Sequence, residues 1–283
     1  MNSLTTAIYK FFLCSTIFVW DIVLSFGNLV RFKRPVGKVT PEGHPGYGGY
    51  WPEYRPPKEG DSRCCCPGLN TMANHGIIAR SGRGIKFTDV NEKINLTYNF
   101  GPSFCSYTTH YAAFMLKRSH SKDTFDLEEI DLHNGIEHDA SLTRLDTEFQ
   151  PKQAEKHVPY IEELLSFATG DNGSYLKIKD MSRILSKRRA ESKANNPNYS
   201  QAFSHKLFGS ANSASMLRIF GGRTDDLRTI LLEERLPEGW ESRVREPYGL
   251  TMLALNTRTT LPLEWGVDES KWADKVKQDN EQV

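Results

Sequence analysis

An apolar run near the N-terminus restricts the folds open to this chain more than any other feature. Residues 11–30, FFLCSTIFVWDIVLSFGNLV, are apolar except for a few small polar residues and Asp21. About 20 such residues are the length that a membrane-spanning helix needs. The run is too long for the core of a signal peptide, and no clear small-residue cleavage site follows it. We therefore predict an N-terminal helix within residues 1–34 that anchors the chain in a membrane.

Two alternatives to a spanning helix remain open. One is a secretory signal that is cleaved late or not at all. The other is a tilted or interfacial helix, because Asp21 is costly at the centre of a bilayer. Basic residues flank the run mainly on its C-terminal side, at Arg31, Lys33, Arg34 and Lys38. By the positive-inside rule we expect an endomembrane protein whose remaining chain faces the cytoplasm, with a secreted or lumenal location as the alternative.

A stretch rich in proline, glycine and aromatic residues separates the apolar run from the rest of the chain. In residues 35–60 the prolines fix backbone torsions and remove helix donors, which favours an extended collar. We expect its aromatic side chains to pack onto the next domain or at the membrane interface. Residues 61–283 suffice for one domain that encloses a cofactor. Lys and Arg number 36 and Asp and Glu 35, so charge favours no nucleic-acid partner.

Helical patterns dominate residues 61–283, and the chain is predicted to be mostly α. Apolar residues recur at helical spacing in residues 158–170. A second helix is predicted to begin at a Thr224 cap and to stop at Pro237. The basic run in residues 182–198 is interpreted as a solvated face. Strand signals are few, and short strands are expected, if anywhere, near residues 250–255.

Three consecutive cysteines, Cys64, Cys65 and Cys66, run into Pro67 in the stretch SRCCCPGLNTMANHG. Proline suits the first position of a helix, because its missing N–H would have no helical partner, and Gly76 provides a stop. Cys66 then lies at the cap position, where unpaired N–H groups and the helix dipole stabilise a thiolate. The pattern therefore singles out one of the three thiols.

Several uses of this thiol compete. A nucleophile needs a histidine base, but His75 lies at the far end of the same short helix. A zinc site needs about four ligands, which Cys66 and His75 do not supply. A haem ligand needs a single thiolate that faces a large apolar pocket. A buried cysteine without a reaction is the ordinary alternative, and the residues alone do not decide between these last two.

Three blocks of the chain resemble the haem-thiolate peroxidase family of chloroperoxidases and unspecific peroxygenases. The block CPGLNTMANHGIIAR matches the family signature at Cys66, Pro67, Asn70, Asn74, His75 and Gly76. The block DLHNGIEHDASLTR matches at Glu137, His138, Asp139 and Ser141. The block EERLPEGW, from Glu233, resembles the C-terminal part of the family. The resemblance spans residues 61–240 in the family's order. It implies a single helical domain of chloroperoxidase type around a buried haem, with the anchor and collar outside it.

The resemblance implies how the cofactor is held. Cys66 is expected to be the axial thiolate of haem b, where a thiolate favours cleavage of the O–O bond of peroxide. The backbone donors of Gly68 and Leu69 are expected to tune this sulfur. His75 is expected to be a hydrogen-bonded core histidine rather than a ligand.

The second block implies a cation site beside the haem. Glu137, the carbonyl of His138 and the hydroxyl of Ser141 resemble ligands that bind Mg²⁺ or Mn²⁺ together with a haem propionate. The alternative is a local cap formed by Asp139 and Ser141. The ring of His138 is expected on the distal side, where the peroxide binds, and Asp139 is expected to orient it.

One part of the family pattern is missing. The family places a distal glutamate further along the chain, but residues 209–222, GSANSASMLRIFGG, contain no carboxylate. By position Asn212 is the expected substitute. Asparagine donates a hydrogen bond but does not carry a proton. Either His138 serves as the base, or the protein has left peroxygenase chemistry.

The leading prediction is a membrane-anchored haem peroxidase or peroxygenase. It would use hydrogen peroxide to oxidise a small apolar or aromatic metabolite, in secondary-metabolite biosynthesis as in the fungal members that the chain resembles. The alternative is a non-catalytic haem protein on the same scaffold, an accessory subunit of a membrane-bound pathway. A third hypothesis is a membrane-tethered helical interaction protein without haem.

Overall fold

The computed structural model describes the backbone of residues 3–281 and the side chains of residues 5–278. It is mostly helical, as predicted. The longer helices are α1 (Ser3–Val30), α2 (Pro67–Asn74), α3 (Phe87–Tyr98), α4 (Pro102–Met115), α5 (Val158–Ser166), α6 (Ile178–Asn195), α7 (Phe203–Ile219) and α11 (Ser270–Glu281). The short helices are α8 (Thr224–Arg228), α9 (Met252–Leu255) and α10 (Leu261–Trp265), with the 3₁₀ turns η1 (Tyr47–Gly49), η2 (Leu127–Asp131) and η3 (Asp171–Gly173). Two π-helical turns, η4 (Thr229–Glu233) and η5 (Asn256–Thr260), continue α8 and α9.

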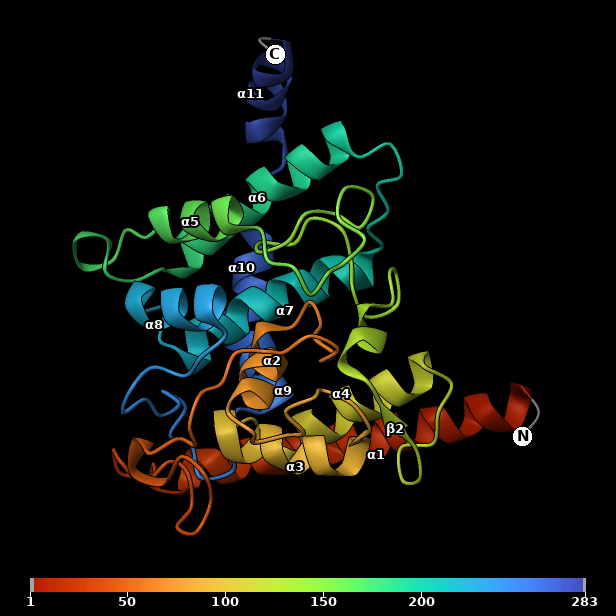
Figure 1. The fold of residues 1–283 in the computed structure, drawn as a ribbon, viewed down its shortest axis with the longest axis vertical. Helices are drawn as coiled ribbons and strands as arrows, with labels where there is room; N and C mark the ends of the chain where they lie inside the picture. Colours follow the sequence, from red (N-terminus) through yellow and green to blue (C-terminus); the bar gives the residue numbers. More distant parts are fainter. Residues whose placement is uncertain (1–2, 282–283) are drawn as a thin grey trace.

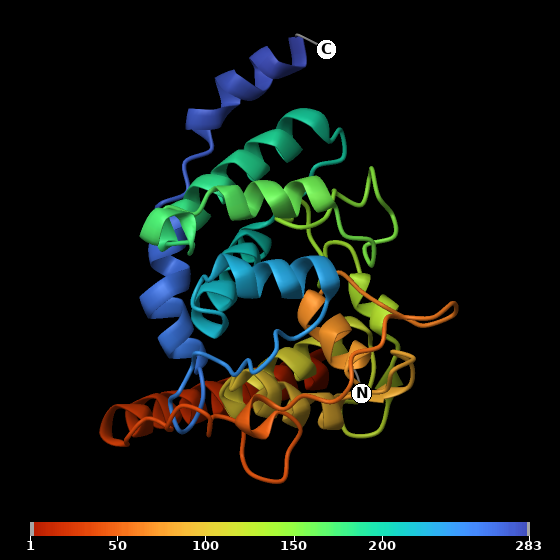
Figure 2. The same cartoon turned by 60° about the vertical axis from the view of Figure 1, so that its left-hand side comes forward.

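The helices are stacked in layers above α1, which lies along one end of the molecule (Figure 1). α4 packs between α1 and α3, and α9 also rests on α1. Above them α7 contacts α6, α9 and α10, so it occupies the middle of the fold. α11 packs on α6 at the opposite end from α1 in both views (Figures 1 and 2).

The core lies between these layers, and the cysteine-containing segment borders it. Its fully buried apolar side chains come from almost every layer: Met72, Phe87, Leu127, Ile161, Leu164, Met181, Ile184, Leu185 and Ile219. α2 packs against the π-helical turn η4 (Figure 2). The fold thus places α2 against a distant segment of the chain, whose last residues begin the third sequence block.

The collar of residues 35–60 has little regular structure, as predicted, and two of its aromatic residues, Trp51 and Tyr54, pack onto the body, whereas Tyr50 is 85 % exposed. Trp51 Nε1 donates to the carbonyl oxygen of Trp240 at 2.8 Å, and the two rings are 6.1 Å apart. Gly49 has a φ of 83°, and a Cβ there would lie 2.7 Å from the carbonyl oxygen of Gly239. Only glycine suits that approach.

Three expectations about individual elements are corrected. The segment near residues 250–255 is helix α9, whereas the two described strands are β1 (Ile85–Lys86) and β2 (Thr124–Phe125), paired antiparallel. The helix that begins at Thr224 ends at Glu233, because Glu234 takes a left-handed conformation with a φ of 51°. Its cap position is Arg223 rather than Thr224.

The basic run is not a solvated face. Arg188 and Arg189 on α6 are each 1 % exposed. Arg188 is paired with Glu163 of α5 at 2.7 Å, and Arg189 with Glu264 of α10 at 2.7 Å. Buried guanidinium groups need such partners, because an unpaired charge in the interior is costly. α6 is therefore joined to both neighbouring helices by ion pairs.

Candidate functional site

The cysteine segment adopts the predicted conformation at the start of α2. Cys66 is the N-cap residue with an extended backbone, and Pro67 is the first helical residue. The side chain of Asn70 fixes the preceding turn, because its Oδ1 accepts from the N–H of Cys64 at 3.0 Å and its Nδ2 donates to the carbonyl oxygen of Cys64 at 2.7 Å. Asn70 thereby sets the position of the cap cysteine.

The three thiols lie in different surroundings. Cys64 is fully buried, Cys65 and Cys66 are both partly exposed, and all five cysteines of the chain are free. Burial raises the pKa of all three thiols, but at Cys66 the backbone N–H groups of Leu69 and Gly68 act in the opposite direction. Those are the two donors expected from the sequence. Of the three thiols, Cys66 is therefore the one whose thiolate is least disfavoured by burial.

A buried ion pair lies behind the cysteine segment, and sequence reasoning did not identify it. Arg144 is fully buried and its guanidinium contacts Glu234 Oε1 at 3.1 Å. The same Oε1 accepts from Asn70 Nδ2 at 2.8 Å, and the carbonyl oxygen of Glu234 accepts from Asn74 Nδ2 at 3.1 Å. These contacts join all three sequence blocks. Both charged residues lie inside the quoted blocks, but nothing in the sequence of the blocks marks either of them as buried.

The second block is held next to the cysteine segment. The N–H of Cys65 donates to Asp131 Oδ1 at 2.7 Å, and Asp131 ends the 3₁₀ turn that precedes this block. Burial raises the pKa of Asp131 to about 6. Arg144 at the end of the block also lies near enough to Cys66 to lower the pKa of its thiol. Both ends of the second block are therefore close to the cap cysteine.

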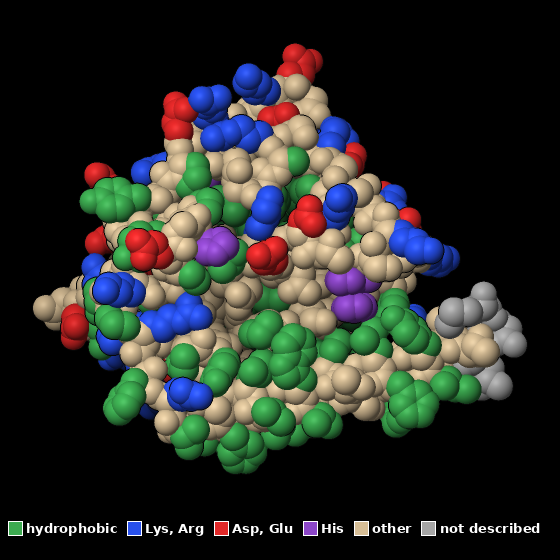
Figure 3. Space-filling model, turned by 90° about the horizontal axis from the view of Figure 1, so that it is seen from below, with side chains coloured by type: hydrophobic (Ala, Val, Ile, Leu, Met, Phe, Trp, Pro, Cys, Tyr) green, Lys and Arg blue, Asp and Glu red, His purple; other side chains and the backbone are tan. Residues whose placement is uncertain are grey.

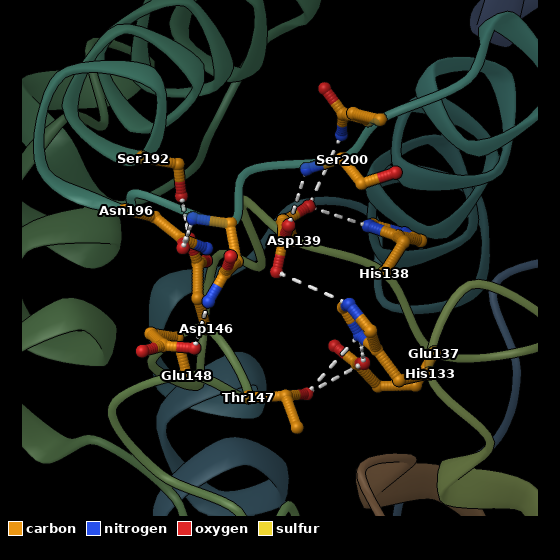
Figure 4. A network of polar contacts seen from close by, with 12 residues as sticks. His133, Glu137, His138, Asp139, Asp146, Thr147, Glu148, Ser192, Asn196 and Ser200 are labelled. Atoms are coloured by element: carbon orange, nitrogen blue, oxygen red, sulfur yellow. Dashed lines mark hydrogen bonds and ion pairs between the residues drawn. The ribbon is translucent and has the colours of Figure 1, made fainter.

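Glu137 lies in the middle of this block with one carboxylate oxygen free. Its Oε2 accepts from His133 Nδ1 at 2.7 Å and from Thr147 Oγ1 at 2.9 Å (Figure 4). Its Oε1 is buried and has no hydrogen-bond partner among the described residues. A buried anionic oxygen without a partner is unfavourable, so this site suits a cation.

The other expected cation ligands, the carbonyl of His138 and the hydroxyl of Ser141, follow Glu137 in the chain. The carbonyl oxygen of His138 accepts none of the hydrogen bonds found among the described residues, whereas Ser141 Oγ accepts from the N–H of Thr143 at 3.3 Å. Carboxylate, carbonyl and hydroxyl oxygens suit Mg²⁺ or Mn²⁺. The donor set therefore fits the expected ion, although Ser141 also forms a local turn.

The ring of His138 is fixed in one orientation and tautomer. Its Nδ1 donates to the carbonyl oxygen of Asp139 at 2.8 Å, which leaves Nε2 as the acceptor. Burial lowers the pKa of His138, which favours the neutral ring. The carboxylate of Asp139 was expected to orient this ring, but its Oδ2 accepts from the N–H of Ser200 at 2.9 Å instead (Figure 4). Asp139 thus acts on His138 through its main chain.

The free edge of His138 faces α7. A Cβ added to Gly209 would lie 3.2 Å from His138 Cε1 and 3.5 Å from its Nε2. His205, one turn earlier, is buried, and its ring lies nearly parallel to that of His138 with centroids 6.3 Å apart. Its Nδ1 has no hydrogen-bond partner among the described residues. Sequence reasoning missed both residues, because only the helix places them opposite His138.

Asn212 and His75 complete the set of predicted residues. Asn212 lies on α7 with an exposed side chain. The residue of α7 that faces His138 is Gly209, not Asn212. His75 has the predicted core role: its Nδ1 donates to the carbonyl oxygen of Pro52 at 2.6 Å, and its Nε2 accepts from the N–H of Leu236 at 3.1 Å.

Comparison with known proteins identifies the family. The model of "Peroxidase, family 2" matches residues 52–245, more than half of the chain. An aromatic peroxygenase of Cyclocybe aegerita is 27 % identical over 179 residues, which cover 57 % of this chain and 45 % of that protein. One of Coprinellus radians is 25 % identical over 162 residues, which cover 52 % of this chain and 61 % of that protein. The chain spans about half the length of these relatives. It belongs to peroxidase family 2, the haem-thiolate peroxidases.

Proposed function

We propose that this protein is a haem-thiolate peroxidase or peroxygenase that uses hydrogen peroxide to oxidise a small apolar or aromatic molecule. The observation that carries the proposal is Cys66, a partly exposed thiol at the cap of α2 in a turn fixed by Asn70. Membership of the family and the two relatives named aromatic peroxygenase support it. Bound haem b with a thiolate ligand would supply the oxidising chemistry.

The chain's own residues would hold this cofactor from one side. Cys66 Sγ would ligate the iron, and the N–H groups of Leu69 and Gly68 would stabilise its negative charge. The ion pair of Arg144 with Glu234 keeps Asn70 in place from behind. Glu137 Oε1, the carbonyl of His138 and Ser141 Oγ would bind Mg²⁺ or Mn²⁺ at a haem propionate.

His138 is the proposed acid–base group on the peroxide side. Its Nε2 can take a proton from peroxide and return it to the other oxygen, because Nδ1 is committed to the carbonyl of Asp139. We expect H138A to lower the turnover of an electron-rich phenol by about 10²–10⁴-fold, the usual contribution of such a group.

A non-catalytic haem protein is the second candidate, and Gly209 favours it. The residue opposite His138 carries no side chain, so α7 supplies no carboxylate at that point. Peroxide turnover separates the two functions. A haem-loaded protein that does not oxidise phenols with peroxide would refute the peroxidase and leave the accessory role.

Cofactor ligation is tested independently of turnover. The ferrous–carbonyl complex should show the red-shifted Soret band of a thiolate ligand. We expect C66A to abolish this shift, whereas the matched C64A and C65A variants retain it. A shift that survives C66A would refute the assignment of the ligand.

The location and pathway belong to the same proposal. We propose an endomembrane protein with a cytoplasmic body that acts in secondary-metabolite biosynthesis, supported by α1 and by the basic residues after it. The glycosylation sequon at Asn172 lies in an exposed turn and reports the side of the membrane. A glycan there would show that the body is lumenal or secreted.

A further inference from the structure

Helix α1 is joined to the body along one face by polar contacts. Asp21 is fully buried, and its Oδ1 accepts from Ser103 Oγ at 2.5 Å and from the N–H of Met252 at 3.0 Å. Its Oδ2 accepts from the N–H of Leu253 at 2.8 Å. The single acid of the apolar run therefore caps α9 and is fully paired. It is not a charge that faces lipid.

The same face continues to both ends of α1. One helical turn after Asp21, Ser25 Oγ contacts Thr251 Oγ1 at 2.7 Å. Asn28 Nδ2 then donates to the carbonyl oxygen of Gly249 at 2.9 Å. Towards the N-terminus, Lys10 Nζ lies 4.7 Å from the ring of Phe114. We call this face, from Lys10 to Asn28, the inner face.

The contacts of the inner face with the body extend along so much of α1 that the helix cannot cross a bilayer without taking part of the body with it. From Lys10 to Asn28 the helix rises about 27 Å, close to the full ~30 Å of the hydrocarbon core. A spanning α1 would therefore carry α4 and the loop before α9 into the hydrocarbon. Irregular backbone such as this loop is not stable in contact with lipid. The geometry instead places α1 beside a membrane rather than through it.

The outer face of α1 is apolar and exposed. Phe12, Val19 and Phe26 recur every seven residues on it and are 64 %, 60 % and 62 % exposed. Seven more large apolar residues of the run are also exposed: Phe11, Phe18, Trp20, Val23, Leu29, Val30 and the adjoining Phe32. Figure 3 shows hydrophobic side chains gathered in a band along this side of the molecule. Only 11 % of the most apolar window of α1 is buried.

The charges around the outer face match a lipid surface. Within residues 11–30 the only charged residue is Asp21, which points inward. Exposed Arg31, Lys33 and Lys38 follow directly after the helix. Long basic side chains at the edge of an apolar face reach anionic headgroups, and aromatic residues favour the interface. A protein partner would not require the basic residues to lie at one end of a face that otherwise carries no charge.

We propose that α1 is a monotopic membrane-docking helix that lies in the plane of one leaflet. Its outer face is buried at the boundary of headgroups and acyl chains, its basic end contacts anionic lipids, and the body rests on that same side of the bilayer. The proposal rests on the membrane association proposed above and replaces a spanning anchor with an in-plane one. It does not depend on haem or on turnover, so its tests fail separately from those of the enzyme.

Immersion depth distinguishes in-plane from spanning helices. Single cysteines replace Phe12, Val19 and Phe26 in the full chain, in which Cys14, Cys65 and Cys66, the native cysteines that are not buried, are changed to Ser. Each is labelled with a fluorophore and quenched by lipids that carry nitroxides at known depths, in phosphatidylcholine vesicles with phosphatidylserine. We expect all three positions at the same shallow depth. A gradient that places Val19 deepest, with Phe12 and Phe26 near opposite surfaces, would overturn the proposal in favour of a spanning helix.

Flotation tests the surface itself. We expect the full chain to float with phosphatidylcholine–phosphatidylserine vesicles, more weakly with phosphatidylcholine alone, and the pair F12E/F26E to lose more than tenfold in vesicle partitioning. W265E is the matched control, because Trp265 is 79 % exposed on α10 and should leave flotation unchanged. Unchanged thermal unfolding of F12E/F26E would confirm that the fold is intact. A chain that does not float, or one that self-associates until F12E/F26E disperses it, would overturn the proposal in favour of a protein-covered face.

Discussion

At the residue scale, Gly209 is the position where a single side chain would change the chemistry most. Its Cα faces Nε2 of His138, so a glutamate there would bring a carboxylate next to the proposed base. Glycine in a helix is also weaker than other residues by about 1 kcal/mol, which favours the change, but a Cβ here would lie 3.2 Å from His138 Cε1, so the imidazole must shift by a few tenths of an ångström to admit the side chain. We expect G209E to raise the rate of peroxide-dependent phenol oxidation by about tenfold or more.

The matched variant N212E decides between the two positions. Asn212 is exposed on the same helix, so N212E adds the same charge without facing His138. Stopped-flow kinetics with peroxide measures both. If N212E accelerates the reaction and G209E does not, the distal position is Asn212, as the sequence alone indicated.

The buried pair of Arg144 and Glu234 carries a stability prediction. Each residue neutralises the other in the interior, and Asn70 depends on the same carboxylate. Removal of one partner leaves a buried charge, so R144M and E234Q should each reduce the free energy of unfolding by about 3–5 kcal/mol. Denaturant unfolding of both variants and of the double variant R144M/E234Q measures the coupling. Additive losses would show that the two side chains do not interact.

His120 makes the stability of the fold depend on pH. Burial, and then the nearby His110, lower the pKa of His120 to about 4 from 6.5; the two rings stack 3.6 Å apart. Between these values the unfolded chain binds a proton that the folded chain does not. The contribution of His120 to stability is therefore complete above about pH 6.5 and is lost as the pH drops towards 4. We expect thermal unfolding of H120Q to depend less on pH in this window, whereas the exposed H44Q keeps the original slope.

A part of the site could be predicted from the sequence only where the interacting residues are close together in the chain. Cys66 and its donors Gly68 and Leu69 lie within four residues; cap geometry identified Cys66, and the family resemblance added its two donors. Arg144 and Glu234 are 90 residues apart, and nothing local to either indicates the other. The role of Gly209 is set by its distance from His138, which only the packing of α7 defines.

At the scale of elements, α1 and α9 stabilise each other through Asp21. α9, η5 and α10 form one continuous helical stretch over residues 252–265, and Asp21 accepts from the first two N–H groups of this stretch, which have no partner within the helix. We expect D21A to lower the free energy of unfolding by about 2–4 kcal/mol, because it leaves three buried donors unpaired. V23A on the outer face should change it by less than about 0.5 kcal/mol. Equal effects of the two variants would contradict this role of the inner face.

Helix α6 shows why local patterns identified elements but not their surroundings. The apolar face of α5 follows from residue spacing, and that helix occurs where expected. The burial of Arg188 and Arg189 does not, since their partners Glu163 and Glu264 are 25 and 75 residues away. A run of basic residues is usually exposed to solvent, and its side chains are buried only where acidic residues of other helices pair with them.

At the scale of the whole molecule, the division into anchor, collar and peroxidase domain depends on whether these parts unfold together or separately. Sequence composition changes sharply after the apolar run, which suggested a separable anchor. In the structure α1 covers α4 and α9, and Trp51 of the collar packs on Trp240. An element with a fully paired buried carboxylate belongs energetically to the body.

The final prediction concerns removal of this element. A chain that begins at Pro35 would expose the buried side of α4 and lose the acceptor that caps α9. We expect it to unfold at a temperature several degrees lower than the full chain, even in solution without lipid. Far-UV circular dichroism and the haem Soret band should report one shared transition in the full chain, because α1 and the haem site unfold together. An unchanged transition after removal of residues 1–34 would show that α1 is a detachable anchor and that its contacts with Ser103, Thr251 and Leu253 contribute nothing to the fold.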